Sequence, residues 1–209
     1  MLQKTPRSTP RVKADRVVFD RDLANSILDE ALICHVGFVG DHAPIVIPTI
    51  HWRLSDRLFF HGSRGGRLNG VMAAGQDLCV TVTLVDGLVL ARSAFHHSMN
   101  YRSVVLFGQA VEVDDGTEKK RAFDALMEKM APGRSPHVRP PNDKELAATR
   151  LLAMTIDEGS VKVRSGPPID SPDDLSWPVW AGVLPLSLAI GHPIADDQMT
   201  VEISAGRPA

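Results

Sequence analysis

Residues 78–85 alternate between large aliphatic and smaller side chains, and this pattern constrains the fold more than any other feature of the sequence. The aliphatic positions are Leu78, Val80, Val82 and Leu84, and the intervening ones are Cys79, Thr81 and Thr83. A period of two is typical of a strand that buries one face and exposes the other. The sequence therefore predicts a sheet with one side against an apolar core.

Other strand signals surround this segment, with short turns between them. Strands are expected at residues 33–39, 44–52, 57–61, 88–94, 101–113, 151–157 and 160–164. Asp86-Gly87 is a dipeptide that favours a tight hairpin turn, and the strand over 101–113 is expected to bend at Gly108. Short turns of this kind predict mostly antiparallel neighbours.

Three segments have features of helices. Leu23, Ile27 and Ala31 recur every four residues after Asp20, whose carboxylate is a suitable N-cap. Residues 117–130 carry apolar side chains at helical spacing, and a short helix is expected after residue 63. Residues 131–142 contain four prolines and are expected to form a loop, residues 144–150 to add a helical turn or two, and residues 166–193 to lack regular structure.

The order of these elements predicts the fold class: mainly β, an antiparallel closed or split β-barrel with inserted helices. A doubly wound parallel sheet is disfavoured because strands and helices do not alternate. The 209 residues suit one domain. We expect a flexible basic arm at 1–17, the barrel domain at 18–190 and a tail at 191–209.

Composition excludes several classes of protein. Only two cysteines, Cys34 and Cys79, are present, which excludes a disulfide scaffold or a cysteine-rich zinc module. The sequence has no uncharged apolar stretch of about 18 residues and no signal peptide, so we expect a cytoplasmic protein without a membrane span. A net charge of −2 does not produce the positive electrostatic field that would attract nucleic acid. Nucleic-acid binding by the basic arm is therefore the weakest alternative.

The segment that follows the strand over 57–61 is the best candidate for an anion site. Ser63 is expected to cap a helix whose first free amides face the anion. Gly65 and Gly66 remove side chains from the approach to the backbone, while Arg64 and Arg67 add positive charge. The spacing matches neither the P-loop nor the GxGxxG fingerprint, and a glycine-rich turn with solvated arginines is the structural alternative.

The histidines and the remaining polar clusters are less informative. None of the eight histidines has the spacing of a zinc site or of a hydrolytic triad, so no metal ion and no catalytic residue is predicted. If a catalytic group exists, His61, beside the anion site, or Tyr101 is the first candidate. Trp177 and Trp180 lie in a proline-rich coil, where they are expected to cover a core edge or a partner subunit rather than to stack on a ligand.

Taken together, these segments resemble the pyridoxamine 5′-phosphate oxidase-like superfamily of split β-barrels, in particular its branch of small flavin-nucleotide-binding and nitroimidazole-resistance proteins. The segments that carry the resemblance are 48–49, 61–63 with 66–67, 101–105 with Gly108, 162–168 and 179–185. They span most of residues 18–186.

The resemblance implies a homodimer that holds two flavin mononucleotides (FMN) at the subunit interface. In that case Ser63 and Arg67 hold the phosphate, with His61 and Gly62 nearby, and Arg67 replaces the lysine that is frequent in the family without loss of charge. Pro48 and Thr49 lie along the isoalloxazine edge, while Trp180 and residues 101–103 come from the partner or line the substrate space. The full implied set is Pro48, Thr49, His61, Gly62, Ser63, Arg64, Gly66, Arg67, Tyr101, Arg102, Ser103 and Trp180.

The function that the resemblance implies is an FMN-dependent oxidoreductase acting on a small organic substrate by hydride transfer, the chemistry of the flavin itself. A flavin-binding protein without turnover, in storage or sensing, is the first alternative. A split barrel that binds haem or a deazaflavin is the second. Haem requires an axial ligand, for which His96 or His97 is the first candidate.

Overall fold

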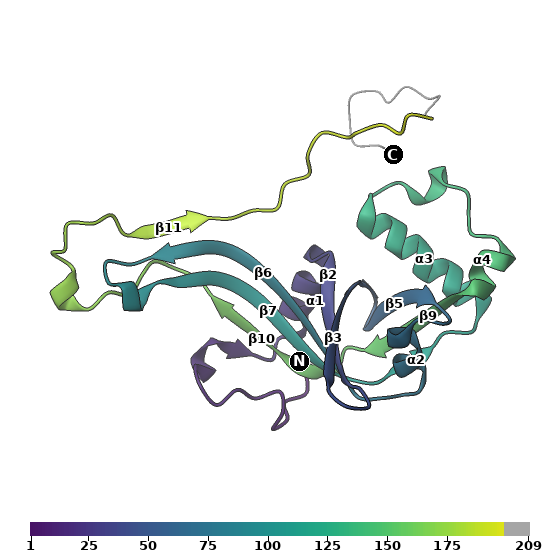
Figure 1. The fold of residues 1–209 in the computed structure, drawn as a ribbon, viewed down its shortest axis with the longest axis horizontal. Coiled ribbons are helices and arrows are strands. Elements are labelled where there is room, and N and C mark those ends of the chain that lie inside the picture. The colour runs from purple at the N-terminus through teal and green to yellow at the C-terminus, as the bar shows by residue number, and fades with distance from the viewer. Residues whose placement is uncertain (199–209) are drawn as a thin grey trace.

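The computed structural model describes residues 1–198, which form two antiparallel sheets with helices around them (Figure 1). The larger sheet has the order β1-β10-β7-β6-β2-β3, with β11 on the same edge of β6 as β2, and the smaller has the order β4-β5-β9-β8. The strands are β1 (Val17–Val18), β2 (Ile33–Val39), β3 (Pro44–Ile50), β4 (Trp52–Leu54), β5 (Arg57–Ser63), β6 (Leu78–Leu90), β7 (Ser98–Gly108), β8 (Ala110–Glu112), β9 (Thr149–Thr155), β10 (Glu158–Arg164) and β11 (Gly182–Pro185).

The chain passes from the larger sheet to the smaller after β3 and again after β7, and it returns after β5 and after β9, which produces the split barrel that the sequence predicts. The expected strands over 44–52 and 101–113 are therefore each two strands, divided at His51 and at Gln109. The main apolar core lies between the sheets and combines side chains of both, including Val80 and Leu106 from the larger sheet and Phe60 and Met154 from the smaller. The division is a tertiary effect, because each half continues in a different sheet.

Four α-helices and four short 3-10 helices complete the described part of the fold. The α-helices are α1 (Arg21–Glu30), α2 (Arg67–Ala73), α3 (Gly116–Met130) and α4 (Asp143–Ala148), and the 3-10 helices span Ala14–Arg16, Ala94–His96, Ser135–His137 and Pro172–Asp174. The Asp20 carboxylate accepts hydrogen bonds from the amides of Asp22 and Leu23, as expected of an N-cap. No helix among residues 1–198 is long and apolar enough to span a membrane.

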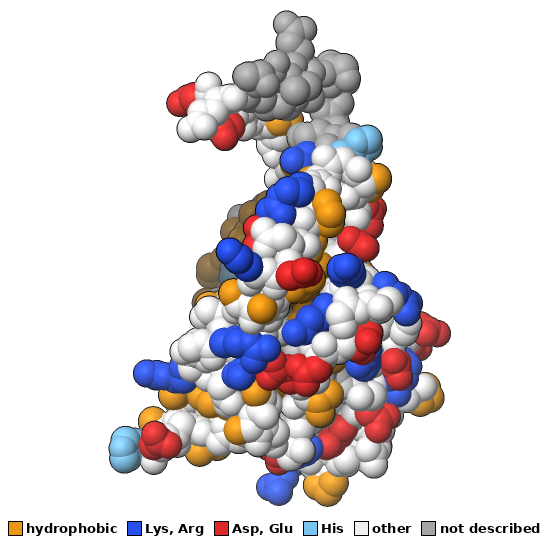
Figure 2. Space-filling view, turned by 90° about the vertical axis from the view of Figure 1, so that its right-hand side faces the viewer, with side chains coloured by type: hydrophobic (Ala, Val, Ile, Leu, Met, Phe, Trp, Pro, Cys, Tyr) orange, Lys and Arg blue, Asp and Glu red, His pale blue; other side chains and the backbone are white. Residues whose placement is uncertain are grey.

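The smaller sheet has a second apolar core on its outer face. Helix α3 packs there with Ala122 and Leu126 against Trp52, Phe59 and the neighbouring strand β9. Strand β5 thus lies between two layers, and its successive side chains alternate between the two cores. Lys and Arg side chains are interspersed with Asp and Glu over the face drawn in Figure 2, without a surface of a single sign.

Two expectations about the β6 region are wrong. Asp86-Gly87 is not a hairpin turn: β6 continues to Leu90, and the register with β7 merely shifts at this point, as in a β-bulge. The hairpin closes instead at Ala94–His96. Residues 166–193 are not without regular structure, since β11 pairs with β6, and a side chain at Gly87 would lie 2.9 Å from Val183 Cγ1. The glycine serves this strand contact rather than a turn.

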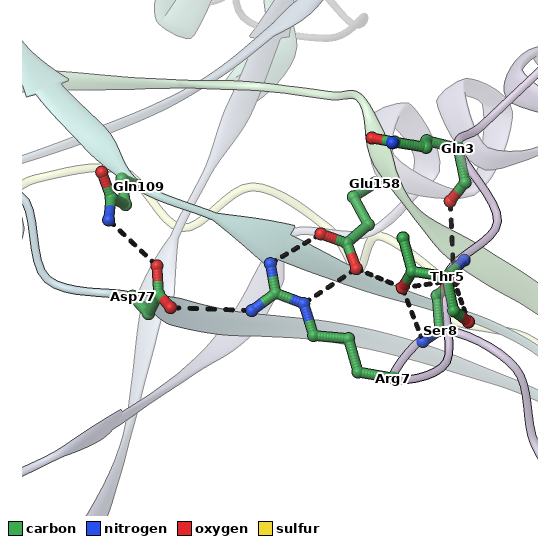
Figure 3. A network of polar contacts seen from close by, with 7 residues as sticks. All are labelled: Gln3, Thr5, Arg7, Ser8, Asp77, Gln109 and Glu158. Atoms are coloured by element: carbon green, nitrogen blue, oxygen red, sulfur yellow. Dashed lines mark hydrogen bonds and ion pairs between the residues drawn. The ribbon is translucent and has the colours of Figure 1, made fainter.

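Residues 1–17, expected to be a flexible arm, pack against the barrel. Leu2 is buried in the main core, and the Arg7 guanidinium lies 5.0 Å from the centroid of the Phe107 ring. Glu158 accepts hydrogen bonds from Arg7 (2.8 and 2.6 Å) and from the Thr5 hydroxyl (Figure 3). Arg7 also contacts Asp77, 3.6 Å away, which in turn accepts a hydrogen bond from Gln109. One arginine thereby ties the N-terminus to β10 and to the start of β6.

This network predicts an acid-sensitive part of the stability. Hydrogen bonds from Arg7 and then Thr5 lower the pKa of the Glu158 carboxyl from 4.5 to about 2. Since the folded pKa is depressed, the stabilisation is present above pH 4.5 and is lost as the pH falls towards 2. We expect the urea midpoint of Glu158→Gln to fall less than that of the wild type between pH 6 and pH 2.5.

Asp41→Asn, at the exposed turn between β2 and β3, is the control and should reproduce the wild-type fall. An equal fall in Glu158→Gln and in the wild type would contradict a stabilising role for this carboxylate.

Candidate functional site

The turn between β5 and α2 holds the residues of the predicted anion site. Ser63 is the last residue of β5, and its carbonyl accepts a hydrogen bond from the amide of Gly66 (3.1 Å). Gly66 is the N-cap of α2 and caps it without a side chain. The expectation that Ser63 is the N-cap is therefore wrong. Because α2 has only seven residues, this turn can offer an anion its side chains and single amides more than a helix dipole.

Asn69 organises the turn, and the sequence reasoning missed it. Its side chain is buried (7% exposed), and its Nδ2 donates a hydrogen bond to the Ser63 carbonyl (3.0 Å). The same amide occupies the space beside Gly62, where an added Cβ would lie 2.2 Å from Nδ2. An asparagine near the start of a short helix is the available signal, since Asn competes for backbone hydrogen bonds and is disfavoured in helix interiors.

The two arginines of the turn have different environments. Arg64 donates to the Ala147 carbonyl (2.9 Å) and lies 3.1 Å from the Glu112 carboxylate, which also pairs with Arg150. Arg67 is exposed and makes no hydrogen bond or ion pair with any described residue. The Ser63 side chain is also exposed, and a Cβ at Gly65 would meet nothing within 4 Å. Arg67, rather than Arg64, is the cation that is available to a ligand.

Pro48 and Thr49 lie on β3, a strand that contacts β5. Pro48 pairs with His35 on β2, and His35 pairs with Thr81 on β6. Pro48 and His35 are exposed and Thr81 is half-buried, so this row follows the outer face of the larger sheet. Thr49 is half-buried and its carbonyl lies 3.6 Å from the Cys34 thiol. These residues offer a flat wall rather than an enclosed pocket.

The remaining predicted residues lie on the long β6–β7 hairpin and its β11 edge, away from the β5–α2 turn (Figure 1). The Arg102 guanidinium is bound by two carboxylates, Glu30 (2.5 and 2.8 Å) and Asp86 (3.0 and 2.7 Å), which raise its pKa. Ser103 Oγ donates to the Lys162 carbonyl (3.3 Å). Trp180 is 60% exposed and its ring covers Gly182. A single chain does not bring these side chains to the turn.

A cavity of about 660 Å³ lies on the other side of β5, bounded by α3, α4 and the loop between them. This volume is within the range of about 300–1,000 Å³ for sites that bind a cofactor-sized molecule. Most of its lining is apolar and comes from Phe123, Leu126, Met127, Pro136, Val138, Pro140, Pro141 and Leu146. Arg139, paired with Glu145 (2.7 Å), provides charge at the exposed rim.

His61 lines this cavity rather than the anion turn. It neighbours Gly62 on β5, and successive residues of a strand face opposite sides, so Gly62 meets Asn69 of α2 while His61 meets α3. Its ring lies 5.6 Å from Trp52 and 6.0 Å, edge-on, from Phe123, measured between ring centroids. The Nδ1 atom is buried and has no partner among the described residues. Burial also lowers the pKa of His61, so the ring is a neutral imidazole at pH 7.

His51 and Lys129, next to Trp52 and α3, form a buried polar pair with a structural role. His51 Nε2 donates to the Leu28 carbonyl (2.9 Å), and Lys129 Nζ donates to the same oxygen (2.8 Å). Burial, reinforced by the charge of Lys129, lowers the pKa of His51 to about 4. His51 is therefore neutral at physiological pH and joins α1, the β3–β4 corner and α3.

These features define a split-barrel protein with an exposed cationic turn on one side of β5 and an apolar, histidine-lined cavity on the other. Comparison with known proteins identifies the family: residues 20–163 match the model described as pyridoxamine 5′-phosphate oxidase. The chain belongs to the pyridoxamine 5′-phosphate oxidase family. The predicted superfamily and the split-barrel fold are confirmed. No curated protein matches the sequence.

Two solved structures are similar over nearly the whole chain. The flavocytochrome Anf3 from Azotobacter vinelandii is 36% identical, with coverage of 96% of this chain and 94% of that one and a TM-score of 0.89. The FAD and haem binding protein from Mycobacterium smegmatis is also 36% identical, with 93% of each chain covered and a TM-score of 0.85. A protein assigned to 5-nitroimidazole resistance in Bacteroides thetaiotaomicron, 23% identical over 70% of this chain and 86% of its own, shares the fold with a TM-score of 0.59.

The contact between Gly62 and Asn69 predicts a rescue experiment. Gly62→Ala forces the Asn69 amide away from the Ser63 carbonyl and leaves buried polar groups unpaired, at a cost of about 1–3 kcal/mol in the free energy of unfolding. We expect the double variant with Asn69→Ala to lose less stability than the sum of the two single changes, because the smaller side chain vacates the space that the new methyl group needs.

Urea unfolding of the four proteins measures the coupling between the two positions. Gly70→Ala, at a helical position with open space around it, is the matched glycine control and should not destabilise the protein. Strict additivity of Gly62→Ala and Asn69→Ala would contradict the role assigned to Asn69.

Proposed function

We propose that this protein is a flavin- and haem-binding oxidoreductase that acts as a homodimer, with the flavin at the cationic turn and the haem in the cavity beside His61. The observation that carries this proposal is the neutral His61 imidazole, which lies among aromatic rings in the wall of an apolar cavity. Two similar proteins of 36% identity are described as a flavocytochrome and as an FAD and haem binding protein, which supports this assignment.

The residues of the cationic turn fit the phosphate of a flavin nucleotide. Arg67 has no competing partner among the described residues, and its guanidinium is suited to a two-point contact with a phosphate. The exposed Ser63 hydroxyl and the backbone at Gly65, with open space around it, complete the cradle. Arg64 has the role of holding the turn to Glu112. Pro48 and Thr49, on the adjoining β3, are proposed to lie along the isoalloxazine ring.

FMN is the proposed nucleotide, and FAD is the alternative that the description of the Mycobacterium smegmatis protein favours. Both carry a phosphate at the end of the ribityl chain, so the cationic turn accounts for either. The flavin, when bound, exchanges a hydride with a small organic substrate. The chain's own part is to hold the phosphate and to orient the ring against β3.

The cavity fits a haem with one protein ligand. A metal-bound histidine must be neutral, and burial of His61 among aromatic rings maintains that state. Apolar side chains from α3 and the following loop offer the porphyrin a dry surface. His96 and His97, the first candidates from sequence, lie at the tip of the β6–β7 hairpin, where His97 Nδ1 contacts the Ser93 carbonyl (3.0 Å). The haem prediction therefore moves to His61.

The homodimer is proposed because the residues predicted for the flavin site lie far apart within one chain. Tyr101, Ser103 and Trp180 lie along the hairpin and its β11 edge, whereas Ser63 and Arg67 lie at the β5–α2 turn. A second copy that places its hairpin beside this turn brings the two groups together. A homodimer with a two-fold axis forms two such sites.

Arg67→Ala tests the flavin site. Loss of a charge-assisted hydrogen bond costs about 1.5–3 kcal/mol, so we expect flavin to bind roughly 10- to 100-fold more weakly, measured by fluorescence quenching of added FMN or FAD. Arg67→Lys should retain most of the affinity.

Arg64→Ala is the matched control, and we expect it to lower thermal stability more than flavin affinity, because Arg64 is engaged by Glu112 and Ala147. Equal flavin affinity in Arg67→Ala and in the wild type would rule out the proposed phosphate contact. Heat extraction of the bound nucleotide, followed by chromatography, distinguishes FMN from FAD.

His61→Ala tests the haem site in protein reconstituted with haemin. Removal of the imidazole that would hold the iron should abolish or strongly shift the Soret band, while flavin absorption stays as in the wild type.

His96→Ala and His97→Ala are the controls, and both should retain the wild-type Soret band. An unchanged spectrum in His61→Ala, or loss of the band in either control, would refute His61 as the ligand. A purified wild type that takes up neither haem nor flavin would overturn the proposed function.

A further inference from the structure

A continuous row of apolar side chains crosses the β6–β7 hairpin and extends onto the C-terminal chain. Leu88 on β6 lies directly opposite Met99 on β7 and opposite Leu184 on β11, so the three share one face of the sheet. All three are exposed: Leu88 by 37%, Met99 by 50% and Leu184 by 45%. A cross-strand cluster of this kind normally belongs to a core or an interface.

The row continues beyond β11. Large apolar residues recur at every second position, 184, 186, 188 and 190, with Pro185, Ser187 and Ala189 between them. In an extended chain, residues two apart share a face. We call the six residues of this row the apolar strip: Leu88, Met99, Leu184, Leu186, Leu188 and Ile190. Glycines and prolines throughout residues 166–193 obscure this short alternation in the sequence.

Beyond Leu186, the apolar strip has no hydrogen-bond partner among residues 1–198. Leu186 donates its amide to the Asp86 carbonyl (3.0 Å), after which residues 187–195 make no hydrogen bond to the rest of the described chain. Figure 1 shows this segment leaving β11 and running clear of both sheets. Leu188 is 86% exposed, Ile190 76% and Ile194, beyond the strip, 97%. The described part of the chain does not shield these side chains from water, so their burial contributes nothing to the stability of this segment there.

A second copy of the chain is the occupant that the features of the strip favour. Residues 186–191 carry no charge, so the strip lacks the complementary groups by which a different protein would usually be selected. The strip is fixed to the sheet at one end and free at the other. It can therefore pack against the same strip of a second subunit about a two-fold axis. Residues 86–90, 98–101 and 182–194 supply about twenty residues, close to the roughly 20–30 per subunit of a stable interface.

We propose that the C-terminal segment, residues 186–194, lies on the partner subunit, where Leu188 and Ile190 cover the Leu88–Met99 face of the partner's hairpin. This inference rests on the proposed homodimer and adds an exchanged segment to it. Because β11 continues directly from Trp180, the exchange also holds Trp180 and the hairpin at the subunit interface, where the flavin site is proposed to be completed.

The double variant Leu188→Asp/Ile190→Asp tests the exchange, with Ser187→Asp/Ala189→Asp on the opposite face as the matched control. Sedimentation equilibrium of the cofactor-loaded proteins measures the dimer dissociation constant. We expect it to rise by about a hundredfold in the first variant, since two buried aliphatic side chains become charged, and by less than about threefold in the control. Circular dichroism should show the same folded barrel in both.

A photo-crosslinking residue at position 188 locates the contact. We expect irradiation to produce a species of twice the chain mass on a denaturing gel, and much less of it when the residue is at position 187. Crosslinking only within one chain would overturn the proposal. Equal dissociation constants in the Leu188→Asp/Ile190→Asp variant and the wild type, or a wild type that is monomeric at every concentration, would do the same.

Flavin and haem absorption, recorded on the same samples, shows whether a negative result concerns the segment exchange or the proposed function. A wild type that carries both cofactors but dimerises without the segment refutes the exchange alone. A wild type that dimerises through the segment but takes up neither cofactor refutes the proposed function alone.

Discussion

The position of β5 between two apolar layers is the constraint on which both candidate sites depend. Side chains of a strand alternate between its faces, and here each face meets a different core: Leu58 and Phe60 face the barrel interior, and Phe59 faces α3. The same alternation directs Gly62 to Asn69 of α2 and His61 to the cavity beneath α3. Two adjacent residues therefore belong to two sites, and a shift of one residue in the register with β9 would exchange them.

The outer core determines the chemical state of His61. Packing of α3 onto Trp52 and Phe59 surrounds the imidazole with aromatic rings, and the removal of water lowers the pKa of the histidine. The anion turn has the opposite character, because Arg67 and Ser63 remain in contact with solvent while Asn69 fixes the backbone from within. One strand thus borders a dry apolar cavity on one side and a solvent-exposed cationic turn on the other.

The hairpin and the C-terminal segment extend the fold beyond the barrel. Strand β6 is long and extends beyond the barrel. It therefore pairs with β2 near its start and with β11 near its end. The outer half of β6 is consequently covered by the chain on its edges but not on its Leu88–Met99 face. The residues predicted for the flavin site fall into two corresponding groups, one on the barrel and the other on the hairpin.

Local patterns in the sequence were sufficient to predict the fold class and most strands, because both depend on side-chain periodicity. They also predicted α1 with its Asp20 cap, α3 and the glycine-arginine turn, which depend on residues close in sequence. The sites of strand division at His51 and Gln109, the bulge at Asp86-Gly87 and strand β11 were decided by tertiary structure, because they depend on pairing partners distant along the chain. The same holds for the choice between Arg64 and Arg67, which followed from Glu112. The side of β5 that His61 faces became clear only from the packing of α3, because alternation in a sequence separates two faces without identifying what covers each.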